Sequence, residues 1–312
     1  MIKIKRGIAI AIAICLCAIP VFLTGCTPSA ESLLKDVVNN LDKIESVSAK
    51  SNMDVDVSIT MYGETVNYKS TLDITTDITT SPDVMHSKGT LSLNLFGAQN
   101  DMNIESYFVT DSDGNTVTYE KTFDNTGWRL SDSTLNTKNF VSIVRDLAAS
   151  DMKMEVTEEK EKDEYLVSGK VPHDILKELI GTALFSNTMI STELANGNYD
   201  FSNFEPVVNI YVDKSKKLPT KISIDFTNDF NTLVHSATID SAELDAQNPN
   251  TPDMDVNKFT LNIAFSGYNE IDKIEVPQDV IKNAKPVSEI ESEQASQAAT
   301  ASTEKATESA KK

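Results

Sequence analysis

The hydrophobic positions near the start of the chain repeat with a helical period. From Glu31 to Ile44 the apolar side chains share one stripe, formed by Leu33, Leu34, Val37, Val38, Leu41 and Ile44. A stripe of this kind predicts an amphipathic helix. Ser29 or Thr27 can cap its first turn, and Pro28 suits a helix start. We therefore expect the first element to be a helix.

From Lys50 onward the hydrophobic period changes to two, which predicts strands with one apolar face. The first block of such strands contains Met53, Val55, Val57, Ile59 and Met61, then Leu72, Ile74, Thr76 and Ile78, then Leu91, Leu93 and Leu95, then Met102 and Ile104, then Val117, Tyr119 and Phe123, and closes with Trp128 and Leu130. The second block contains Val208, Ile210 and Val212, then Ile222, Ile224 and Phe226, then Val234 to Ile239, then Phe259, Leu261, Ile263 and Phe265. Short connections, with a tight-turn signal at Asp113-Gly114, predict antiparallel pairing.

Other parts of the chain interrupt this strand pattern. Helical stripes recur at Asn139 to Ala149 and at Pro172 to Leu194, and the charged run Glu158 to Glu164 predicts an exposed hairpin turn. After Pro286 the composition becomes poor in large apolar residues. Because such a segment cannot bury enough apolar area to offset its chain entropy, residues 287–312 are predicted to be a disordered tail.

The N-terminus has the features of an export signal. A basic start precedes an apolar run from Gly7 to Phe22, which is shorter than the roughly 20 residues that span a bilayer. The run ends in Leu23, Thr24, Gly25 and Cys26, which resemble the bacterial lipobox. The resemblance implies that Cys26 carries a diacylglyceryl group and that the mature chain is anchored to the cell membrane on its extracytoplasmic face. An ordinary signal or a short anchor helix is the alternative.

Composition narrows the classes of function. The chain has 28 Lys and Arg residues against 47 Asp and Glu, a net charge of -19, and no basic run after its start, which disfavours nucleic-acid binding. Two of its three cysteines lie in the apolar run and the third is Cys26, so no disulfide framework is expected.

No residue constellation indicates a reaction or a metal. The three histidines lack metal-ligand spacing, at positions His86, His173 and His235. Ser32 and Lys35 match an SxxK pattern whose partner motifs are missing. Asp111, Asp113 and Asn115 are spaced as in a calcium loop, but the required glycine and terminal glutamate positions do not match. We expect a non-enzyme with no cofactor and no metal.

The order of these elements resembles the LolA/LppX/LprG-like group of lipid and lipoprotein carriers. The likeness is carried by the helix start at Glu31, by Ser46 to Lys50 entering the first strand, by Gly127-Trp128, by Lys217 to Ile222, and by Ile274 to Pro277. The resemblance implies a mostly β, α+β fold, a strongly curved antiparallel half-barrel with about three helices over its concave face. It divides the chain into a signal peptide at 1–25, the lipidated cysteine and tether at 26–30, one domain at 31–286 and the tail at 287–312. In related lipoproteins of Gram-positive bacteria the function is mostly unassigned, and the resemblance implies lipid handling in a Gram-positive cell envelope.

A wide concave sheet covered by few helices predicts an apolar cavity. Its candidate lining consists of Leu91, Leu93, Leu95, Ile222, Ile224, Phe226, Leu261, Ile263 and Phe265. The opposing interpretation is that these side chains fill the interior completely, as in ordinary protein cores. Two functions remain in competition: a membrane-anchored lipoprotein that binds or transfers a lipid or other hydrophobic ligand, and a surface lipoprotein that binds a protein or an envelope polymer.

Overall fold

The structure, a computed structural model, describes residues 27–110, 115–121, 127–133, 140–150, 153–171, 175, 204–244 and 253–289. The predicted lipobox, the turn at Asp113-Gly114, Phe123 of a predicted strand and residues 290–312 of the tail predicted at 287–312 lie outside these ranges. Of the predicted helix at 172–194, only Ile175 is described, and it is helical and buried.

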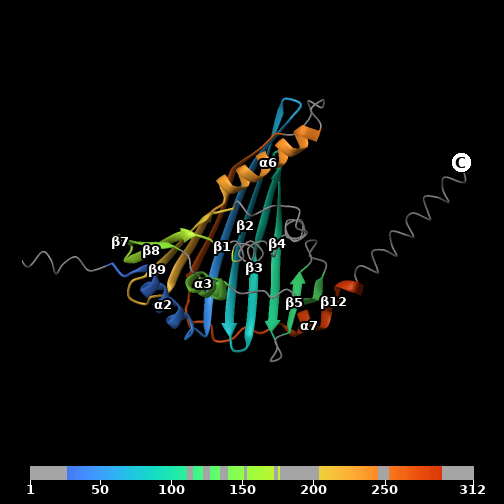
Figure 1. Ribbon diagram of the computed structural model, residues 1–312. Coiled ribbons are helices and arrows are strands. Elements are labelled where there is room, and N and C mark those ends of the chain that lie inside the picture. The colour runs from blue at the N-terminus through green and yellow to red at the C-terminus, as the bar shows by residue number, and fades with distance from the viewer. Residues whose placement is uncertain are drawn as a thin grey trace, which may run out of the picture.

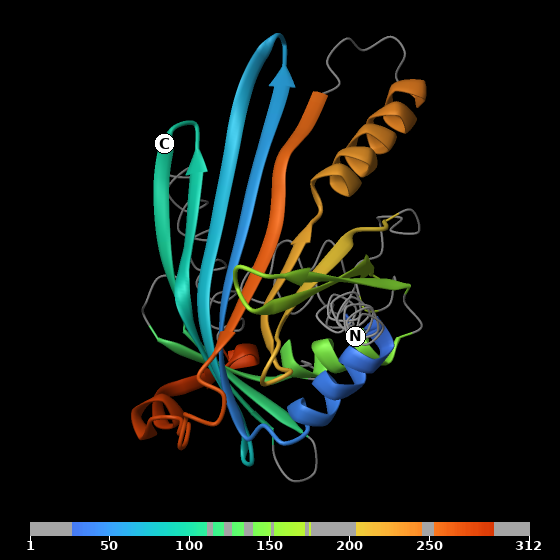
Figure 2. The same cartoon turned by 90° about the vertical axis from the view of Figure 1, so that its left-hand side faces the viewer.

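Twelve described strands form one sheet in the order β12-β6-β5-β4-β3-β2-β1-β11-β10-β9-β8-β7. All neighbours pair antiparallel except β12 and β6, which are parallel. The long strands β1 to β4 stand side by side, and the sheet curls around them (Figures 1 and 2). This confirms the predicted fold class of a curved, mostly antiparallel sheet with added helices. The strand bounds are β1 Ser46–Met61, β2 Glu64–Thr80, β3 Asp83–Leu95, β4 Ala98–Thr110, β5 Thr116–Lys121, β6 Trp128–Ser133, β7 Met154–Glu159, β8 Glu164–Lys170, β9 Val207–Asp213, β10 Pro219–Asp225, β11 Asp253–Ser266 and β12 Ala284–Pro286.

Four helices have described bounds: α2 Ala30–Leu41, α3 Phe140–Ala149, α6 Thr227–Leu244 and α7 Gln278–Asn283. The first two confirm the helices predicted at 31–44 and 139–149. The hydroxyl of Ser29 accepts a hydrogen bond from the backbone N–H of Ser32 at 3.2 Å, which makes Ser29 the N-cap of α2. Leu33, Leu34, Val37 and Leu41 form the buried side of that helix.

The predicted strand at Val234–Ile239 is wrong, because these residues belong to α6. Phe230, Leu233 and Val234 follow the i, i+3, i+4 spacing and pack against the core, as one face of a helix does. The side chain of Asn231 also holds α6 to β11, accepting from the N–H of Val256 at 2.6 Å and donating to its carbonyl at 2.7 Å. These tertiary contacts outweigh the strand preference of the β-branched residues.

The outer, convex face of β1, β2 and β11 carries a polar network. Lys258 pairs with Asp54 at 2.6 Å, and Lys69 pairs with Asp56 at 2.7 Å. The bond from Lys69 to Asp56, though opposed by partial burial, helps hold the pKa of Asp56 below its usual value. Because successive side chains of a strand point to opposite faces, the apolar side chains of these strands lie on the concave face.

A second small core lies on the outer face at the lower end of β3 to β6. Val84 and Tyr107 pack there against Ile274 and Val280, which come from the segment after β11 and from α7. The ring of Tyr107 stacks on His86 with centroids 4.3 Å apart and lies 5.9 Å from the ring of Trp128. The chain after β11 thus closes the convex side of the sheet at this end, where α7 and β12 lie in Figure 1.

Gly89 permits a close approach of two strands in the middle of the sheet. A Cβ atom at this position would lie 1.9 Å from the backbone oxygen of Asp73 in β2, which is far inside van der Waals contact. Only glycine fits where β2 and β3 come this close, and such a position is typical of a bend.

Candidate functional site: the concave face

On the concave face, the inward side chains of neighbouring strands lie opposite one another and form rows that cross the sheet. One apolar row joins β11, β1, β2, β3 and β4 through Leu261, Met53, Leu72, Leu91 and Met102. The next row toward the lower end contains Ile263, Ser51, Ile74, Gly89 and Ile104. The inner surface is therefore a band of large aliphatic groups several strands wide.

The row below these contains polar groups. Thr76, Ser87 and Ser106 lie opposite one another on β2, β3 and β4, and each is less than 9% exposed. The hydroxyls of Thr76 and Ser87 are hydrogen-bonded at 2.9 Å. The same register continues to Glu120 on β5 and Arg129 on β6. A row of hydroxyl groups that ends in one acidic and one basic side chain, Glu120 and Arg129, thus crosses the apolar concave face.

Glu120 and Arg129 are unusual for inward positions. Burial raises the pKa of the Glu120 carboxyl, and the positive charge of Arg129 opposes this shift only in part. The Nε of Arg129 is buried and has no hydrogen-bond partner in the part of the chain that the structure describes. A buried N–H donor without a partner destabilises the fold, so the Nε of Arg129 can still donate a hydrogen bond to an acceptor. Sequence reasoning missed the pair because the two residues come together only through the pairing of β5 with β6.

The nine residues predicted to line a cavity lie on the concave face or at its upper rim. Ile222, Ile224, Leu261 and Ile263 are at most 2% exposed and belong to the main hydrophobic core. Leu91, Phe226 and Phe265 are also buried, whereas Leu93 is only partly buried. Leu95 is 44% exposed. The nine residues therefore lie on one surface, which is buried in the core at one end and exposed to solvent at the other.

Exposure along the long strands increases steadily toward their upper end. On β1 the inward side chains go from Met53, 2% exposed, through partly buried Val55 and Val57 to Met61, 42% exposed. On β3 they go from Leu91, 3% exposed, through Leu93 to Leu95. The apolar concave surface is therefore continuous from the interior to the outside at this end.

An aromatic cluster closes the β10 and β11 side of the concave face. The rings of Phe226 and Phe259 lie 5.3 Å apart, and Phe230 from α6 packs 4.5 Å from Phe259 and 5.0 Å from Phe204. Rings at these separations stabilise one another beyond their buried area. Sequence reasoning missed Phe230 because it predicted a strand at Val234–Ile239 and assigned no element to the first turns of α6. The helix α6 rises beside the upper half of β11, away from the tip of β3 and β4 (Figure 2).

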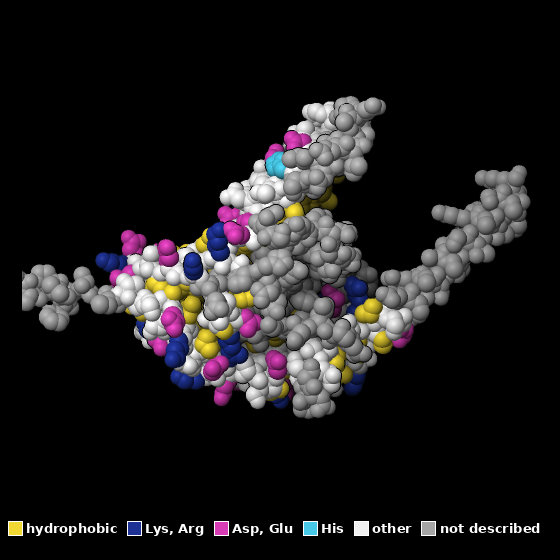
Figure 3. Space-filling model, viewed as in Figure 1, with side chains coloured by type: hydrophobic (Ala, Val, Ile, Leu, Met, Phe, Trp, Pro, Cys, Tyr) yellow, Lys and Arg dark blue, Asp and Glu magenta, His cyan; other side chains and the backbone are white. Residues whose placement is uncertain are grey.

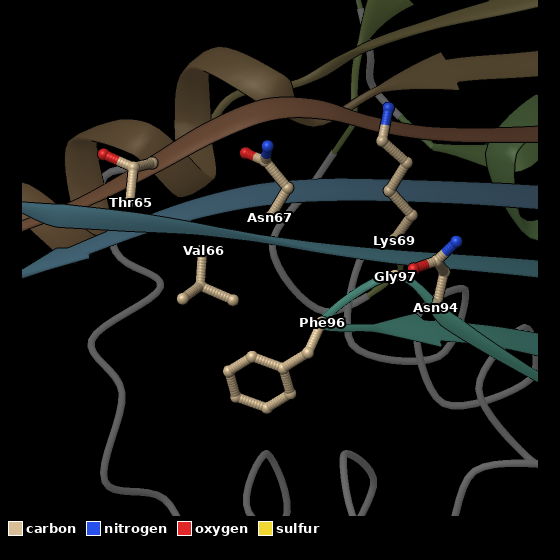
Figure 4. A pocket seen from close by; sticks show the side chains of 7 residues that line it. All are labelled: Thr65, Val66, Asn67, Lys69, Asn94, Phe96 and Gly97. Carbon is tan, nitrogen blue, oxygen red and sulfur yellow. The ribbon is translucent and has the colours of Figure 1, made fainter.

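A shallow hollow of about 450 Å³ lies at the upper end, where β2 extends beyond the end of β3. It is lined by Thr65, Val66, Asn67, Lys69, Asn94, Phe96 and Gly97. Figure 4 shows Val66 and Phe96 pointing to one side of the sheet and Thr65, Asn67 and Lys69 to the other. The hollow is a step at the rim of the sheet, with an aromatic ring beside it.

Two properties of the described residues bear on chemistry and on membrane insertion. They contain no group of three or more His, Cys, Asp or Glu side chains placed to hold a metal ion. Within the same residues, none of the helices combines the length and the apolar character that a membrane span requires.

Comparison with known proteins places the chain in a family. The model described as "Family of unknown function (DUF6612)" matches residues 29–285, which is most of the chain, so the protein belongs to that family. No curated protein matches it. The predicted resemblance to LppX/LprG-like lipoproteins agrees with a match to the crystal structure of LprF from Mycobacterium bovis, at 9% identity and a TM-score of 0.41, covering 81% of this chain and 99% of that chain.

Two further solved structures are similar over most of the chain. A DUF1329 family protein from Desulfovibrio piger has 11% identity and a TM-score of 0.24, with coverage of 77% of this chain and 92% of that chain. A β-barrel-like protein with a DUF1849 domain from Brucella abortus has 11% identity and a TM-score of 0.21, with coverage of 70% and 96%.

Proposed function

We propose that this DUF6612 protein binds a lipid or another hydrophobic ligand on its concave face and performs no chemical step on it. The observation that carries the proposal is the apolar surface that runs without a break from buried Leu91 to exposed Leu95. In an ordinary core such a surface ends inside the molecule, whereas here it reaches solvent and provides an entry route for an apolar chain.

The polar row supports an amphiphile as the ligand rather than a pure hydrocarbon. Next to the apolar rows lie the buried hydroxyls of Ser87 and Ser106 and the Nε of Arg129, which has no hydrogen-bond partner among the described residues. A molecule with acyl chains and a polar head would bury its chains against the aliphatic rows and offer acceptors to these groups. Each methylene removed from water contributes roughly 0.8 kcal/mol, so one long chain is enough for tight binding.

The proposal includes an anchor on the extracytoplasmic face of the cell membrane. The lipobox residues end at Cys26, and the first described residue of the domain is Thr27, with α2 starting at Ala30. A tether of four residues reaches at most about 14 Å, so the α2 end of the domain would remain close to the headgroups of its own membrane.

The ligand is tested with the secreted chain carrying Cys26→Ser, so that no covalently bound acyl group contributes lipid. Solvent extraction of the purified protein, followed by mass spectrometry, should release an acyl-chain species at about one per protein. The protein should also bind a fluorescent fatty acid. Absence of both co-purified lipid and fatty-acid uptake would overturn the proposal.

Two matched lysine substitutions separate a cavity from a filled core. Leu93→Lys places a charge on the partly buried apolar surface and should reduce fatty-acid binding strongly while the protein stays folded. Ser92→Lys places the same charge on the outer face, opposite Asp101, and should leave binding unchanged. Unfolding by Leu93→Lys, as expected for fully buried Ile263→Lys, would favour the filled-core interpretation and a protein- or polymer-binding lipoprotein.

The anchor is tested separately by metabolic labelling. The wild-type chain should incorporate labelled palmitate and remain in the membrane fraction, and Cys26→Ala should incorporate none. Palmitate in the Cys26→Ala variant would contradict the lipobox assignment and leave the ligand proposal untouched.

A further inference from the structure

The upper end of the long strands carries two exposed aromatic hairpin tips. In the part of the chain that the structure describes, six large apolar side chains are exposed, and four of them lie here. Tyr62 is 75% exposed and Phe96 is 81% exposed, with Met61 and Leu95 next to them at 42% and 44%. The strand ends and α6 form an arm that rises above the body of the molecule (Figures 1 and 3).

Both tips use an aromatic residue where turn chemistry disfavours one. The pairs Met61 with Glu64 and Leu95 with Ala98 close two-residue hairpin loops, Tyr62-Gly63 and Phe96-Gly97. Tyr62 has φ of 56° and Phe96 has φ of 54°, each followed by a glycine with φ of 79°. Asn, Asp or Gly fits the first of these positions at less cost than a bulky side chain. The aromatic rings are therefore not explained by the turns and point to a role outside the fold.

The tips are also depleted of charge. Residues 57–68 contain one charged side chain, Glu64, and residues 89–100 contain none, in a chain that is 24% charged. The polar groups of these two stretches are otherwise neutral, such as Asn67, Asn94 and Asn100, while the neighbouring β11 places acidic Asp253 and Asp255 opposite Thr60 and Ser58. A surface that must leave water avoids charges, because burying an unpaired charge is costly. The pattern of exposed rings with a neutral polar border matches the composition at membrane–water interfaces.

The tips lie at the end of the molecule opposite α2 (Figures 1 and 2), where the inward side chains Met61 and Leu95 are exposed. Strand β1 has 16 residues between its start after α2 and the Tyr62 tip, which is about 50 Å at roughly 3.3 Å per residue. Leu95 belongs to the inward row of β3 and joins directly to Phe96. A bilayer that receives the rings would touch the exposed end of the apolar surface.

We propose that the Tyr62 and Phe96 tips insert into the interfacial layer of a neutral lipid bilayer and place the open end of the concave face against it. This proposal rests on the proposed function, because docking to the bilayer would serve to exchange the ligand with it. Leu95 at the end of β3 pairs with Tyr68, and β2 continues four residues beyond Tyr68, so the Tyr62 tip extends further than the Phe96 tip. Both tips therefore contact a flat bilayer only when the strands are tilted relative to its surface. The commitment to neutral lipid follows from the net charge of -19 and from the pairing of Lys69, the cation that lines the hollow beside Phe96, with Asp56 at 2.7 Å.

The test is flotation with phosphatidylcholine vesicles of the Cys26→Ser chain, expressed without residues 1–25 so that the apolar run from Gly7 to Phe22 contributes no lipid binding. The wild-type sequence should float with the vesicles, and Tyr62→Ser or Phe96→Ser should each lower the partition coefficient roughly tenfold, as expected for removal of one buried aromatic ring. The double variant should lower it roughly a hundredfold. Val207→Ser is the matched control, because Val207 is 45% exposed but lies elsewhere, and it should leave flotation unchanged.

A spectroscopic readout places the ring in lipid. Trp128 is the only tryptophan, so Phe96→Trp in a Trp128→Phe background reports on the tip alone. Its emission should shift to the blue when phosphatidylcholine vesicles are added. No shift and no flotation of the wild-type sequence, or equal flotation of the double variant, would overturn the proposal. Binding that requires added phosphatidylglycerol would also overturn it, because it would indicate charge-driven contact through another surface.

The outcomes distinguish this inference from the proposed function. In the double variant, equilibrium binding of a fluorescent fatty acid should be unchanged, while its transfer from vesicles to the protein should slow at least tenfold. A protein that floats through its tips but binds no fatty acid would retain the docking inference and lose the ligand proposal. A protein that binds fatty acid with tips that never enter lipid would do the reverse.

Discussion

The two ends of the long strands β1 to β4 have opposite characters. At the lower end Val47 and Ile78 are at most 1% exposed, and Leu33 and Leu41 of α2 are as deeply buried in the same core. At the upper end the same strands finish in Met61, Tyr62, Leu95 and Phe96, all exposed. One sequence pattern therefore produces a sealed end and an apolar open end, and the difference lies in what covers the strands rather than in the strands themselves.

Hydrogen bonds reinforce the lower end. The side-chain oxygen of Asn269 accepts from the backbone N–H groups of Glu45, at 2.7 Å, and Ser46, at 3.4 Å. The backbone N–H of Asn269 donates to the carbonyl of Ser46 at 2.8 Å. The start of β1 is thereby fixed to the chain that leaves β11, and this junction holds the base of the sheet.

The largest expected difference between the two ends is in the free energy of unfolding that is lost when an apolar side chain is truncated. Ile78→Ala at the lower end leaves a cavity in a fully buried site and should reduce the free energy of unfolding by about 2 to 5 kcal/mol. Met61→Ala at the upper end should reduce it by less than about 1 kcal/mol, because its side chain is already in contact with water. Urea denaturation followed by circular dichroism measures both. Equal losses would mean that the tips are packed in solution and would contradict the open-end description.

The junction at Asn269 should give an intermediate effect. Asn269→Ala removes the bonds to Glu45 and Ser46 and leaves alanine at a φ of 60°, so we expect a loss of about 1 to 3 kcal/mol. Asn269→Gly loses the same bonds but tolerates the backbone, so it should be less destabilised than Asn269→Ala. The same denaturation measurement compares them. If glycine were the worse substitution, the backbone conformation would not be part of the cost.

The smallest expected effect concerns the polar row near the lower end. Burial raises the pKa of Glu120 above its usual value of 4.5, so the folded protein holds this proton more tightly than the unfolded chain does. This tighter binding of the proton stabilises the folded protein below pH 4.5, and the stabilisation is lost as the pH rises through the raised pKa of Glu120. Glu120→Gln should flatten the fall in Tm across that interval, and exposed Glu155→Gln should not. An unchanged pH profile in Glu120→Gln would show that the carboxyl is hydrated in the native state.

Much of the fold was predictable because the inward alternation of the strands is strong. Met53 to Met61, Leu91 to Leu95 and Phe259 to Phe265 all lie in strands as predicted. The strand predicted at Val234–Ile239 failed because Phe230 and Asn231, just before it, bind α6 to β11. The three residues of β12 are a strand only because β6 lies beside them, so no local pattern could reveal them.

The site was predictable in part. The nine proposed lining residues all lie on the concave face or at its rim, but sequence alone does not say which are sealed and which are open. Glu120 and Arg129 needed the register of β5 and β6 to be recognised as an inward pair. The tips had a usable signal, Tyr62-Gly63 and Phe96-Gly97 each between two alternating runs, but turn prediction looks for Asn-Gly or Asp-Gly and passes over them.

The open sheet leaves two outer strands, and their composition bears on solubility. A strand with an unpaired edge is a template for joining another chain and starting aggregation. At one margin β7 has the sequence Met154-Glu-Val-Thr-Glu-Glu159, in which three carboxylates repel a second copy of the same strand. At the other margin β12 is three residues long and ends in Pro286, which has no N–H to offer an incoming strand. A protein that displays apolar rings at one end is thus protected from polymerising along its sides.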